Sequence, residues 1–473
     1  MADEIEAPEV TLELLRNCFE GAIPIVIATV SADGTPNVTY LSKAHLVDDE
    51  RIALSNQFLS KSARNLAEHP RASLLFLDPI THNEARVHVA YERTERRGPV
   101  FDELRADVDA VAALTGMEDV FRLRSADIYR VQRAERVPAS EQADGTSGAA
   151  PIVPERRALP SMAAVADLCG RLTRCGDLDS LVNVTVDGLA QLLGYEHSMV
   201  LLLDEAGERL FTIASHGYAE QGVGSEVRMG DGVLGTVAKR CEAVRMGNAG
   251  QMVKYAEALR RTYESSGVGP GREIPLPGLA RANSCAAVPI QSLGQLVGVL
   301  FVEAIQHAHF EPEDEAALTV VASVLANAIE AIRAEERSAE AVRSAAGSTP
   351  VATPVAPVSP GPSTSSADTV HVRFFPVDGS TFLEGDYLIK GVAGRILWAL
   401  LGHYERDGRV DFTNREVRLD PSLDLPDFRD NFESRLILLK RRLDERDAPI
   451  RIEKTGRGRF RLVVETTLRL DQA

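Results

Sequence analysis

A lysine and a serine stand side by side in the first turn of a predicted helix. The helix covers residues 61–69, lies between two predicted strands, and has Ser60 as its candidate N-cap. Lys61 offers a positive charge and Ser62 a hydroxyl group. The first turn of a helix adds free backbone N–H groups and a favourable dipole. Together these groups suit the binding of a phosphate.

A basic segment near the end of the chain suits a different kind of chemistry. Between Arg451 and Arg461 five basic residues accompany one acid, and two glycines let the backbone approach a ligand closely. Such a segment suits contact with DNA phosphates or entry into the minor groove. The helix predicted at 428–446 adds cations, but its acids Asp430 and Glu433 would oppose a phosphate backbone. The candidate DNA-binding residues are Arg429, Arg435, Lys440, Lys454, Arg457 and Arg459.

The elements that must position the lysine–serine pair are mostly strands. Residues 23–30 form an apolar run that stops at Asp33-Gly34, a hairpin turn in which glycine supplies a positive φ. Residues 36–42 then alternate, which places neighbouring side chains on opposite faces of a strand. Further strands are predicted at 51–55, 72–77, 86–94 and 127–132, and a second helix at 101–114.

The length and composition of the chain predict a multidomain α+β protein. At 473 residues the chain is too long for one core, and three domains are expected. The net charge of −17 argues against wholesale binding to nucleic acid or to an anionic membrane. The charge is unevenly spread, because residues 370–473 carry a net +1 and the remainder −18.

Two segments rich in proline, alanine and serine divide the chain. They lie at 134–159 and 344–369, and repeated prolines predict extended linkers there. The folded blocks are therefore expected at 1–133, 160–343 and 370–473.

The sequence predicts a cytoplasmic protein without a membrane anchor. No run of eighteen apolar residues occurs, and the nearest approach, Ala286–Val302, is interrupted by polar residues. The acidic N-terminus lacks the features of a signal peptide. The five cysteines are scattered, so no metal site is expected.

The first block resembles the pyridoxamine 5′-phosphate oxidase-like FMN split barrel. The residues that carry the resemblance are 27–38, 53–57, 61–66 and 69–72. The resemblance implies FMN, with its phosphate at Lys61 and Ser62. The alternative is that Lys61 is a solvated charge, as in split barrels that have lost their cofactor.

The rest of the flavin would then lie along two strands. Ser55, Asn56 and Gln57 would contact the ribityl chain, or they form a plain polar turn. Thr39 and Tyr40 would face the isoalloxazine ring. No catalytic residue is assigned. The candidate cofactor-binding residues are Thr39, Tyr40, Ser55, Asn56, Gln57, Lys61, Ser62 and Asn65.

The second block closely resembles the GAF fold, an α/β/α sandwich. The resemblance rests on predicted helices at 163–174 and 179–193, strands at 198–204 and 209–215, and the segments 230–238, 284–302 and 310–315. It implies an unknown small-molecule ligand under a lid at 251–281, or a pure dimerisation scaffold. A bilin is not favoured, because Cys241 and Cys285 are both expected in strands and neither precedes a histidine.

The helix that ends the second block carries an apolar stripe. Leu318, Val321, Leu325, Ala328 and Ile332 follow one another at alternating spacings of three and four, as in the a/d seam of a coiled coil. The stripe predicts a parallel homodimer. Packing of the helix on its own sheet would use the same stripe.

The third block resembles the C-terminal effector domain of response regulators, a winged helix-turn-helix. Residues 439–443 and 455–462 carry the resemblance. It implies binding to duplex DNA, and the alternative is a winged helix that binds protein.

Together the three resemblances indicate a sensory transcription regulator. FMN or a GAF ligand would control DNA binding by allostery, because no ATPase motif and no phosphoacceptor module occur. The alternative is an FMN-dependent oxidoreductase whose other domains regulate turnover, and a third hypothesis is a protein-interaction hub.

Overall fold

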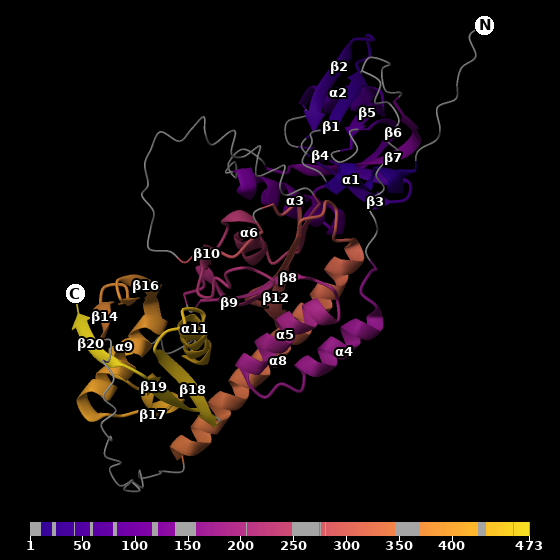
Figure 1. Ribbon diagram of the computed structural model, residues 1–473. Coiled ribbons are helices and arrows are strands. Elements are labelled where there is room, and N and C mark those ends of the chain that lie inside the picture. Colours follow the sequence, from indigo (N-terminus) through magenta and orange to yellow (C-terminus); the bar gives the residue numbers. More distant parts are fainter. Residues whose placement is uncertain are drawn as a thin grey trace, which may run out of the picture.

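The computed structural model consists of three blocks arranged in a row (Figure 1). The first block spans residues 11–137, the second 158–345 and the third 369–472. The structure describes residues 11–20, 25–41, 43–56, 60–78, 83–115, 122–137, 158–204, 206–247, 274, 276–279, 281–345, 369–423, 432–456 and 458–472.

The first block is built on a seven-stranded antiparallel sheet with the order β2-β1-β5-β6-β7-β4-β3. Alternate residues of its strands, such as Ile27, Leu74 and Val87, are fully buried. Gly34 has a φ of 83°, as the predicted Asp33-Gly34 turn requires. The strands are β1 (Ile25–Val30), β2 (Pro36–Leu41), β3 (Ala44–Asp48), β4 (Arg51–Asn56), β5 (Arg71–Leu77), β6 (Glu84–Glu95) and β7 (Ser125–Arg136).

Within the described residues, four short or medium helices accompany this sheet. Helix α2 lies on β1 and β2, and α3 packs on β4 and β7. The sequence did not predict strand β3, because only Ala44 in it is fully buried and no alternation is visible. The helices are η1 (Leu12–Leu15), α1 (Arg16–Glu20), α2 (Ser60–Glu68) and α3 (Pro99–Thr115).

The second block is a six-stranded antiparallel sheet with the order β10-β9-β8-β13-β12-β11. Helices α4, α5 and α8 pack on one face, and α6 packs on the other. The strands are β8 (His197–Leu203), β9 (Arg209–His216), β10 (Glu226–Arg228), β11 (Val244–Met246), β12 (Ser284–Ser292) and β13 (Gln295–Ala304). The helices are α4 (Met162–Leu172), α5 (Leu178–Gln191), α6 (Gly232–Arg240) and α8 (Pro312–Ala345).

The apolar stripe of α8 is part of the core of its own block. Leu318, Val321 and Leu325 are completely buried, because α8 packs on β12 and on helices α4 and α5. The prediction that these residues form a dimer seam is therefore corrected: they are covered within one chain. The same helix contains the segment Pro312–Glu335. Among the described residues it is the one helical segment that is long and apolar enough to cross a membrane. The strand pair at Ala286–Val302, which the sequence suggested as the nearest approach, is β12 and β13.

The expected strand position of Cys241 is wrong. Cys241 forms the C-cap of α6 in the left-handed conformation, with a φ of 58°. Its N–H bonds to the Val237 carbonyl, so the helix ends there rather than continuing into a strand. Cys285 lies in β12, as expected.

In the part that the structure describes, the third block combines two small sheets with three helices. One sheet has the order β16-β15-β14-β20, in which β20 runs parallel to β14, and the other has the order β17-β19-β18. Strand β20 was not predicted. The helices are α9 (Gly391–Asp407), α10 (Asn414–Arg418) and α11 (Phe432–Glu445), with the 3-10 turn η2 (Pro421–Leu423). The strands are β14 (Thr369–Phe375), β15 (Ser380–Leu383), β16 (Asp386–Ile389), β17 (Asp411–Thr413), β18 (Ile450–Gly456), β19 (Arg459–Val464) and β20 (Thr467–Gln472).

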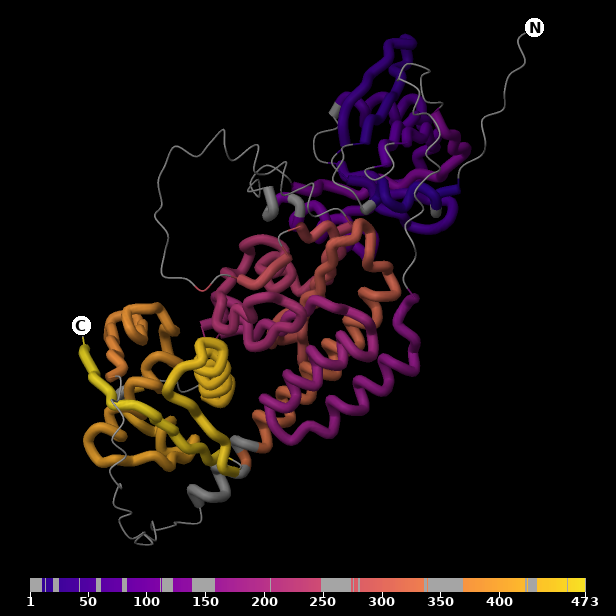
Figure 2. Tube along the Cα trace, viewed as in Figure 1, coloured from indigo at the N-terminus to yellow at the C-terminus, as the bar shows by residue number. Residues whose placement is uncertain are grey.

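Neighbouring blocks touch mainly through one helix each. Helix α3 of the first block packs on α6 and β11 of the second. Helix α11 of the third block packs on α5 and β9 of the second, where Figure 2 shows the yellow coil beside the magenta strands. The buried apolar residues of the second and third blocks consequently form one continuous core.

Candidate functional site

The first turn of α2 carries the two residues predicted to hold a phosphate. Lys61 is exposed, whereas Ser62 is almost fully buried. The Ser62 hydroxyl accepts a hydrogen bond of 3.0 Å from Asn37 Nδ2 on β2. One turn further on, buried Asn65 donates a hydrogen bond of 3.1 Å to Thr29 Oγ1 on β1. These two bonds fix α2 on the sheet and leave the Lys61 side of the turn open.

The end of β4 holds the next pair of predicted residues. Ser55 is buried, and its hydroxyl accepts a hydrogen bond of 3.1 Å from the Lys43 N–H. Asn56 donates a hydrogen bond of 2.9 Å to Asp127 Oδ2. Gln57 lies outside the described residues. Both described side chains are therefore held by neighbouring strands.

Asp127 on β7 is a polar centre that the sequence did not reveal. Its Oδ1 accepts hydrogen bonds from Thr94, at 2.7 Å, and from Ser125, at 3.1 Å. Together with Asn56, these donors satisfy a buried carboxylate. Burial, with the Asp127 charge adding to it, raises the pKa of Tyr129 nearby. The hydrogen-bond partners of Asp127 come from three strands, so no local sequence pattern could have identified this residue.

Thr39 and Tyr40 lie on opposite faces of β2. Thr39 is on the same face as Asn37, toward α2, while Tyr40 is 72% exposed on the outer face beside Val38. The prediction that both face one flavin ring is therefore corrected. Only one of the two can contact a ring bound on either face of the sheet.

The donor set near Lys61 fits a phosphate on the open side of the α2 turn. Lys61 offers a cation, and the first turn of this nine-residue helix points backbone N–H groups outward. Ser62 accepts from Asn37 and still has its own hydroxyl proton to donate. The arrangement suits an anion and not a metal.

The face of the second-block sheet that α6 covers carries a buried carboxyl group. Glu303 on β13 lies opposite Cys285 on β12 and accepts a hydrogen bond of 2.8 Å from the Leu279 N–H. Burial raises the pKa of Glu303, although Leu279 and the Tyr218 hydroxyl favour its charged form. Burial and then Glu303 raise the pKa of Cys285 to about 12, so this thiol is not a thiolate nucleophile. Most of the predicted lid, 251–281, lies outside the described residues.

A cavity of about 1040 Å³ lies between the first and second blocks. Its walls come from α1, β3 and α3 on one side and from β11 and the start of α8 on the other. Six of the charged side chains on its walls pair with one another. The ion pairs are Lys43–Asp107 at 3.4 Å, His45–Glu103 at 3.0 Å and Arg245–Glu315 at 3.6 Å.

The hairpin β18–β19 contains the described part of the basic segment. Two of its arginines are neutralised within the third block, Arg451 by Glu465 and Arg461 by two bonds to Asp411. Arg459 is exposed and has no ion-pair partner among the residues that the structure describes. Gly458, beside it, has a φ of 65° and forms the turn. Arg429 and Arg457 lie outside the described residues.

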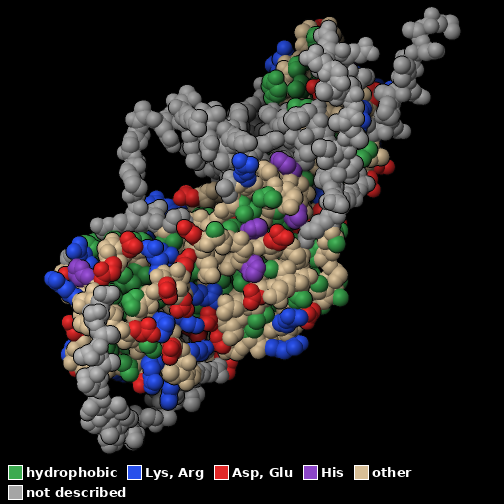
Figure 3. Space-filling view, in the orientation of Figure 1, with side chains coloured by type: hydrophobic (Ala, Val, Ile, Leu, Met, Phe, Trp, Pro, Cys, Tyr) green, Lys and Arg blue, Asp and Glu red, His purple; other side chains and the backbone are tan. Residues whose placement is uncertain are grey.

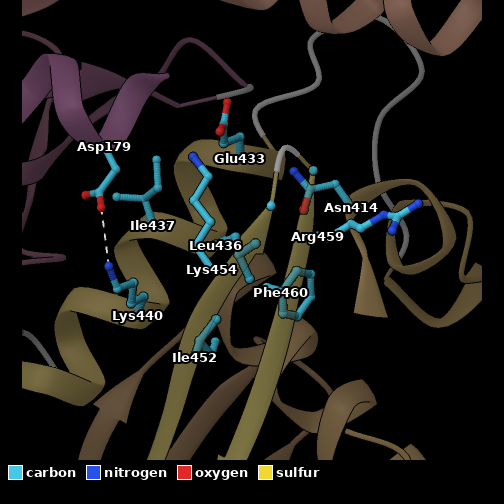
Figure 4. A pocket seen from close by; sticks show the side chains of 12 residues that line it. Asp179, Asn414, Glu433, Leu436, Ile437, Lys440, Ile452, Lys454, Arg459 and Phe460 are labelled. Atoms are coloured by element: carbon cyan, nitrogen blue, oxygen red, sulfur yellow. Dashed lines mark hydrogen bonds and ion pairs between the residues drawn. The ribbon is translucent and has the colours of Figure 1, made fainter. Parts of the chain in front are cut away.

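The remaining predicted DNA-binding residues face the second block. Lys440 forms an ion pair of 3.3 Å with Asp179, and Lys454 one of 3.3 Å with Asp177. Arg435 lies over the ring of Phe211, 4.1 Å from its centroid. Figure 4 shows Lys440 directed at Asp179, while Arg459 lies on the far side of the same pocket.

Comparison with known families assigns the first two blocks. Residues 12–132 match the family model described as pyridoxamine 5′-phosphate oxidase, and residues 177–329 match the model of the GAF domain. A pyridoxamine 5′-phosphate oxidase-like domain is followed by a GAF domain. Neither model extends past residue 329.

Several solved structures resemble one or the other domain at low identity. For the GAF domain, the GAF domain of an Acinetobacter phosphoenolpyruvate-protein phosphotransferase is 24% identical and covers 36% of this chain and 93% of its own, with a TM-score of 0.29. Free methionine-R-sulfoxide reductase of Neisseria meningitidis is 18% identical, covering 38% and 98%, with a TM-score of 0.29. For the oxidase-like domain, an FMN-binding protein of Syntrophomonas wolfei is 19% identical, covering 27% and 92%, with a TM-score of 0.22. No curated protein matches the chain.

Asp314, in the segment 310–315 that the GAF resemblance includes, has a structural role. Buried Asp314 accepts hydrogen bonds from the Tyr195 hydroxyl, at 2.9 Å, and from the Glu311 N–H, at 2.7 Å. It therefore fixes the start of α8. Among the described residues no three His, Cys, Asp or Glu side chains lie close enough together to hold a metal ion.

Proposed function

We propose that this protein is a cytoplasmic transcription regulator with a winged-helix DNA-binding output. An oxidase-like domain followed by a GAF domain fits a sensory regulatory protein. In the proposal, bound FMN or a small molecule in the GAF domain controls whether the third block binds duplex DNA. No motif for ATP hydrolysis is needed, because ligand affinity that differs between two states is sufficient.

The observation that carries the DNA-binding part is exposed Arg459 at a glycine turn beside α11. The order of the third block supports a winged helix, since α9, α10 and α11 precede the hairpin β18–β19. Charged side chains of both signs mix over this block, at the lower left of Figure 3. A mixed surface favours selective, salt-sensitive contact with DNA over general adhesion.

FMN is the proposed cofactor of the oxidase-like domain. Lys61 and the first-turn N–H groups of α2 would hold its phosphate, with Ser62 positioning Asn37. When bound, FMN supplies redox chemistry that can report the state of the cell. The chain's own contribution is to bind the phosphate and to fix the neighbouring strands.

An oxidoreductase is the second candidate function, and the open Lys61 corner favours it equally. Turnover of a reduced nicotinamide by the FMN-loaded protein would identify the enzyme. Among the described residues near Lys61, none is assigned as a catalytic acid or base. We therefore propose the regulator first.

A homodimer is also proposed, but not through the buried stripe of α8. An exposed apolar face on the hairpin β1–β2 supports it, because Val38 and Tyr40 are 65% and 72% exposed and Val30, opposite Pro36, lies on the same face. Exposed apolar groups that adjoin one another on a strand near the sheet edge favour protein contact.

The experiment that tests the DNA-binding output uses the whole protein and a random-sequence duplex. We expect salt-sensitive binding, and Arg459→Ala should reduce the salt slope by about one unit because one phosphate contact is lost. Arg469→Ala, which removes an exposed arginine from β20, is the matched control. Equal slopes for the two variants would contradict the proposed role of the hairpin.

A further inference from the structure

One arginine of the third block makes several specific contacts with the GAF domain. Arg441 on α11 donates hydrogen bonds of 2.7 and 3.1 Å to Asp179 Oδ1. It also donates to Asn183 Oδ1, at 2.7 Å, and to the Ile213 carbonyl, at 3.0 Å. The Arg441 side chain is only 13% exposed. A charged fork held at these three acceptor atoms in a nearly buried position is a specific contact.

Apolar and backbone contacts extend this interface along α11. Leu438 is almost fully buried, and a Cβ placed at Gly224 of the GAF domain would lie 3.7 Å from its Cδ1. Glu445, one turn after Arg441, accepts a hydrogen bond of 3.0 Å from the Gly222 N–H. The docked face of α11 is therefore part of a packed core and more than a set of surface ion pairs.

The acids on the GAF side lie at the N-terminus of α5. Asp177 is the N-cap and accepts a hydrogen bond of 3.1 Å from the Ser180 N–H. Asp179 lies in the first turn, where a negative charge is favourable. They face Lys440, Lys454 and Arg441, and two of these three cations are predicted DNA contacts.

We propose that the GAF domain and DNA compete for the same basic face of the third block, so that the structure is an autoinhibited state. Asp177 and Asp179 take the place of DNA phosphates against α11 and β18. The inference rests on the proposed DNA-binding function. It adds that the GAF domain controls that function by direct occlusion.

The segment between β9 and β10 connects this interface with the interior of the GAF domain. Tyr218, whose hydroxyl lies near buried Glu303, is only four positions before Gly222 in the segment between β9 and β10. The Ser215 hydroxyl donates a hydrogen bond of 2.7 Å to the Gln221 carbonyl and holds this segment in place. A ligand that displaces Tyr218 would shift Gly222 and weaken its bond to Glu445.

The test removes the two acids from the full chain without changing the helix cap. In Asp177→Asn/Asp179→Asn, asparagine at 177 still caps α5. The control Asp167→Asn/Asp187→Asn removes two acids from α4 and α5 whose ion-pair partners, Arg171 and His216, lie in the GAF domain itself. Binding to a labelled random-sequence duplex is measured by fluorescence anisotropy, and hydrogen exchange of α5 and α11 is measured without DNA.

We expect the first variant to bind the duplex about tenfold more tightly than the control, with faster exchange in α11. Equal affinities of the variant and the control would overturn the proposal. If α11 exchanges faster in the variant and no protein binds DNA, the DNA-binding function fails and the competition with it. If exchange is unchanged, Asp177 and Asp179 do not hold the third block, which also overturns the proposal.

Discussion

Arg105 on helix α3 of the oxidase-like domain donates a hydrogen bond of 2.5 Å to Glu242 of the GAF domain. Helix α3 packs on both domains through two different faces. One face places Leu104 in a cluster with strands β4 and β7, and the other places Ala106 and Ala110 in the apolar cluster under α6. Because β4 also carries predicted flavin residues, α3 connects that part of the oxidase-like domain with the GAF domain.

The alanine face of α3 should not tolerate a larger side chain. Ala110 is completely buried against the GAF domain, so Ala110→Leu forces the two domains apart or strains both. Such overpacking typically costs roughly 1–3 kcal/mol. Denaturant unfolding should show this loss for Ala110→Leu and almost none for Ala166→Leu on the exposed side of α4. Equal stabilities would mean that α3 does not pack on α6 in solution.

Lys61 should be required for tight binding of FMN. Its ammonium group is exposed at the open side of the α2 turn, where a phosphate would gain a charge-assisted bond. We expect Lys61→Ala to weaken FMN binding about tenfold or more. Quenching of flavin fluorescence measures the affinity, and Lys239→Ala on α6 removes an equal charge as the control. A wild-type protein that takes up no FMN would refute the cofactor itself.

The exposed face of β1–β2 should decide the oligomeric state. Val38→Asp/Tyr40→Asp places two charges where apolar side chains adjoin, so a dimer that uses this face dissociates. Light scattering at micromolar concentration should give a dimer for the wild type and a folded monomer for the variant. The control Leu293→Asp/Val377→Asp changes two apolar residues that are 98% and 95% exposed at other places. A monomeric wild type would contradict the prediction.

Local patterns of the sequence predicted those elements whose side chains alternate clearly. The strand containing Ile27 and the turn at Gly34 follow directly from burial and backbone preference. The contact of Arg441 with Asp179 could not be predicted in this way, because it joins residues 262 positions apart. Asp127 was missed for the same reason, since its hydrogen-bond donors lie on different strands.

A stripe of apolar residues also has two physical solutions that the sequence does not distinguish. Leu318 and Val321 satisfy the spacing of a coiled coil and equally that of a helix packed on a sheet. The choice depends on whether a sheet is available to cover the stripe. Here β12 covers the stripe, and this contact depends on the tertiary fold of the whole block rather than on the local sequence.

Glu303 should make the stability of the GAF domain depend on pH in a defined direction. Burial raises its pKa in the folded state, although Leu279 and Tyr218 partly oppose the shift. The folded state therefore prefers the protonated carboxyl group. Ionising the buried carboxyl group lowers the free energy of unfolding. This destabilisation is absent below the unfolded pKa of about 4.3, grows as the pH rises, and is complete above the folded pKa.

Glu303→Gln provides the test, because glutamine stays neutral and can still accept the Leu279 hydrogen bond. Near pH 7 the variant should be more stable than the wild type, and the difference should shrink as the pH falls toward about 4. Denaturant unfolding at several pH values measures it, with Glu208→Gln at an exposed turn as the control. A variant that is less stable near pH 7 would mean that the carboxylate is charged and fully satisfied in the folded protein.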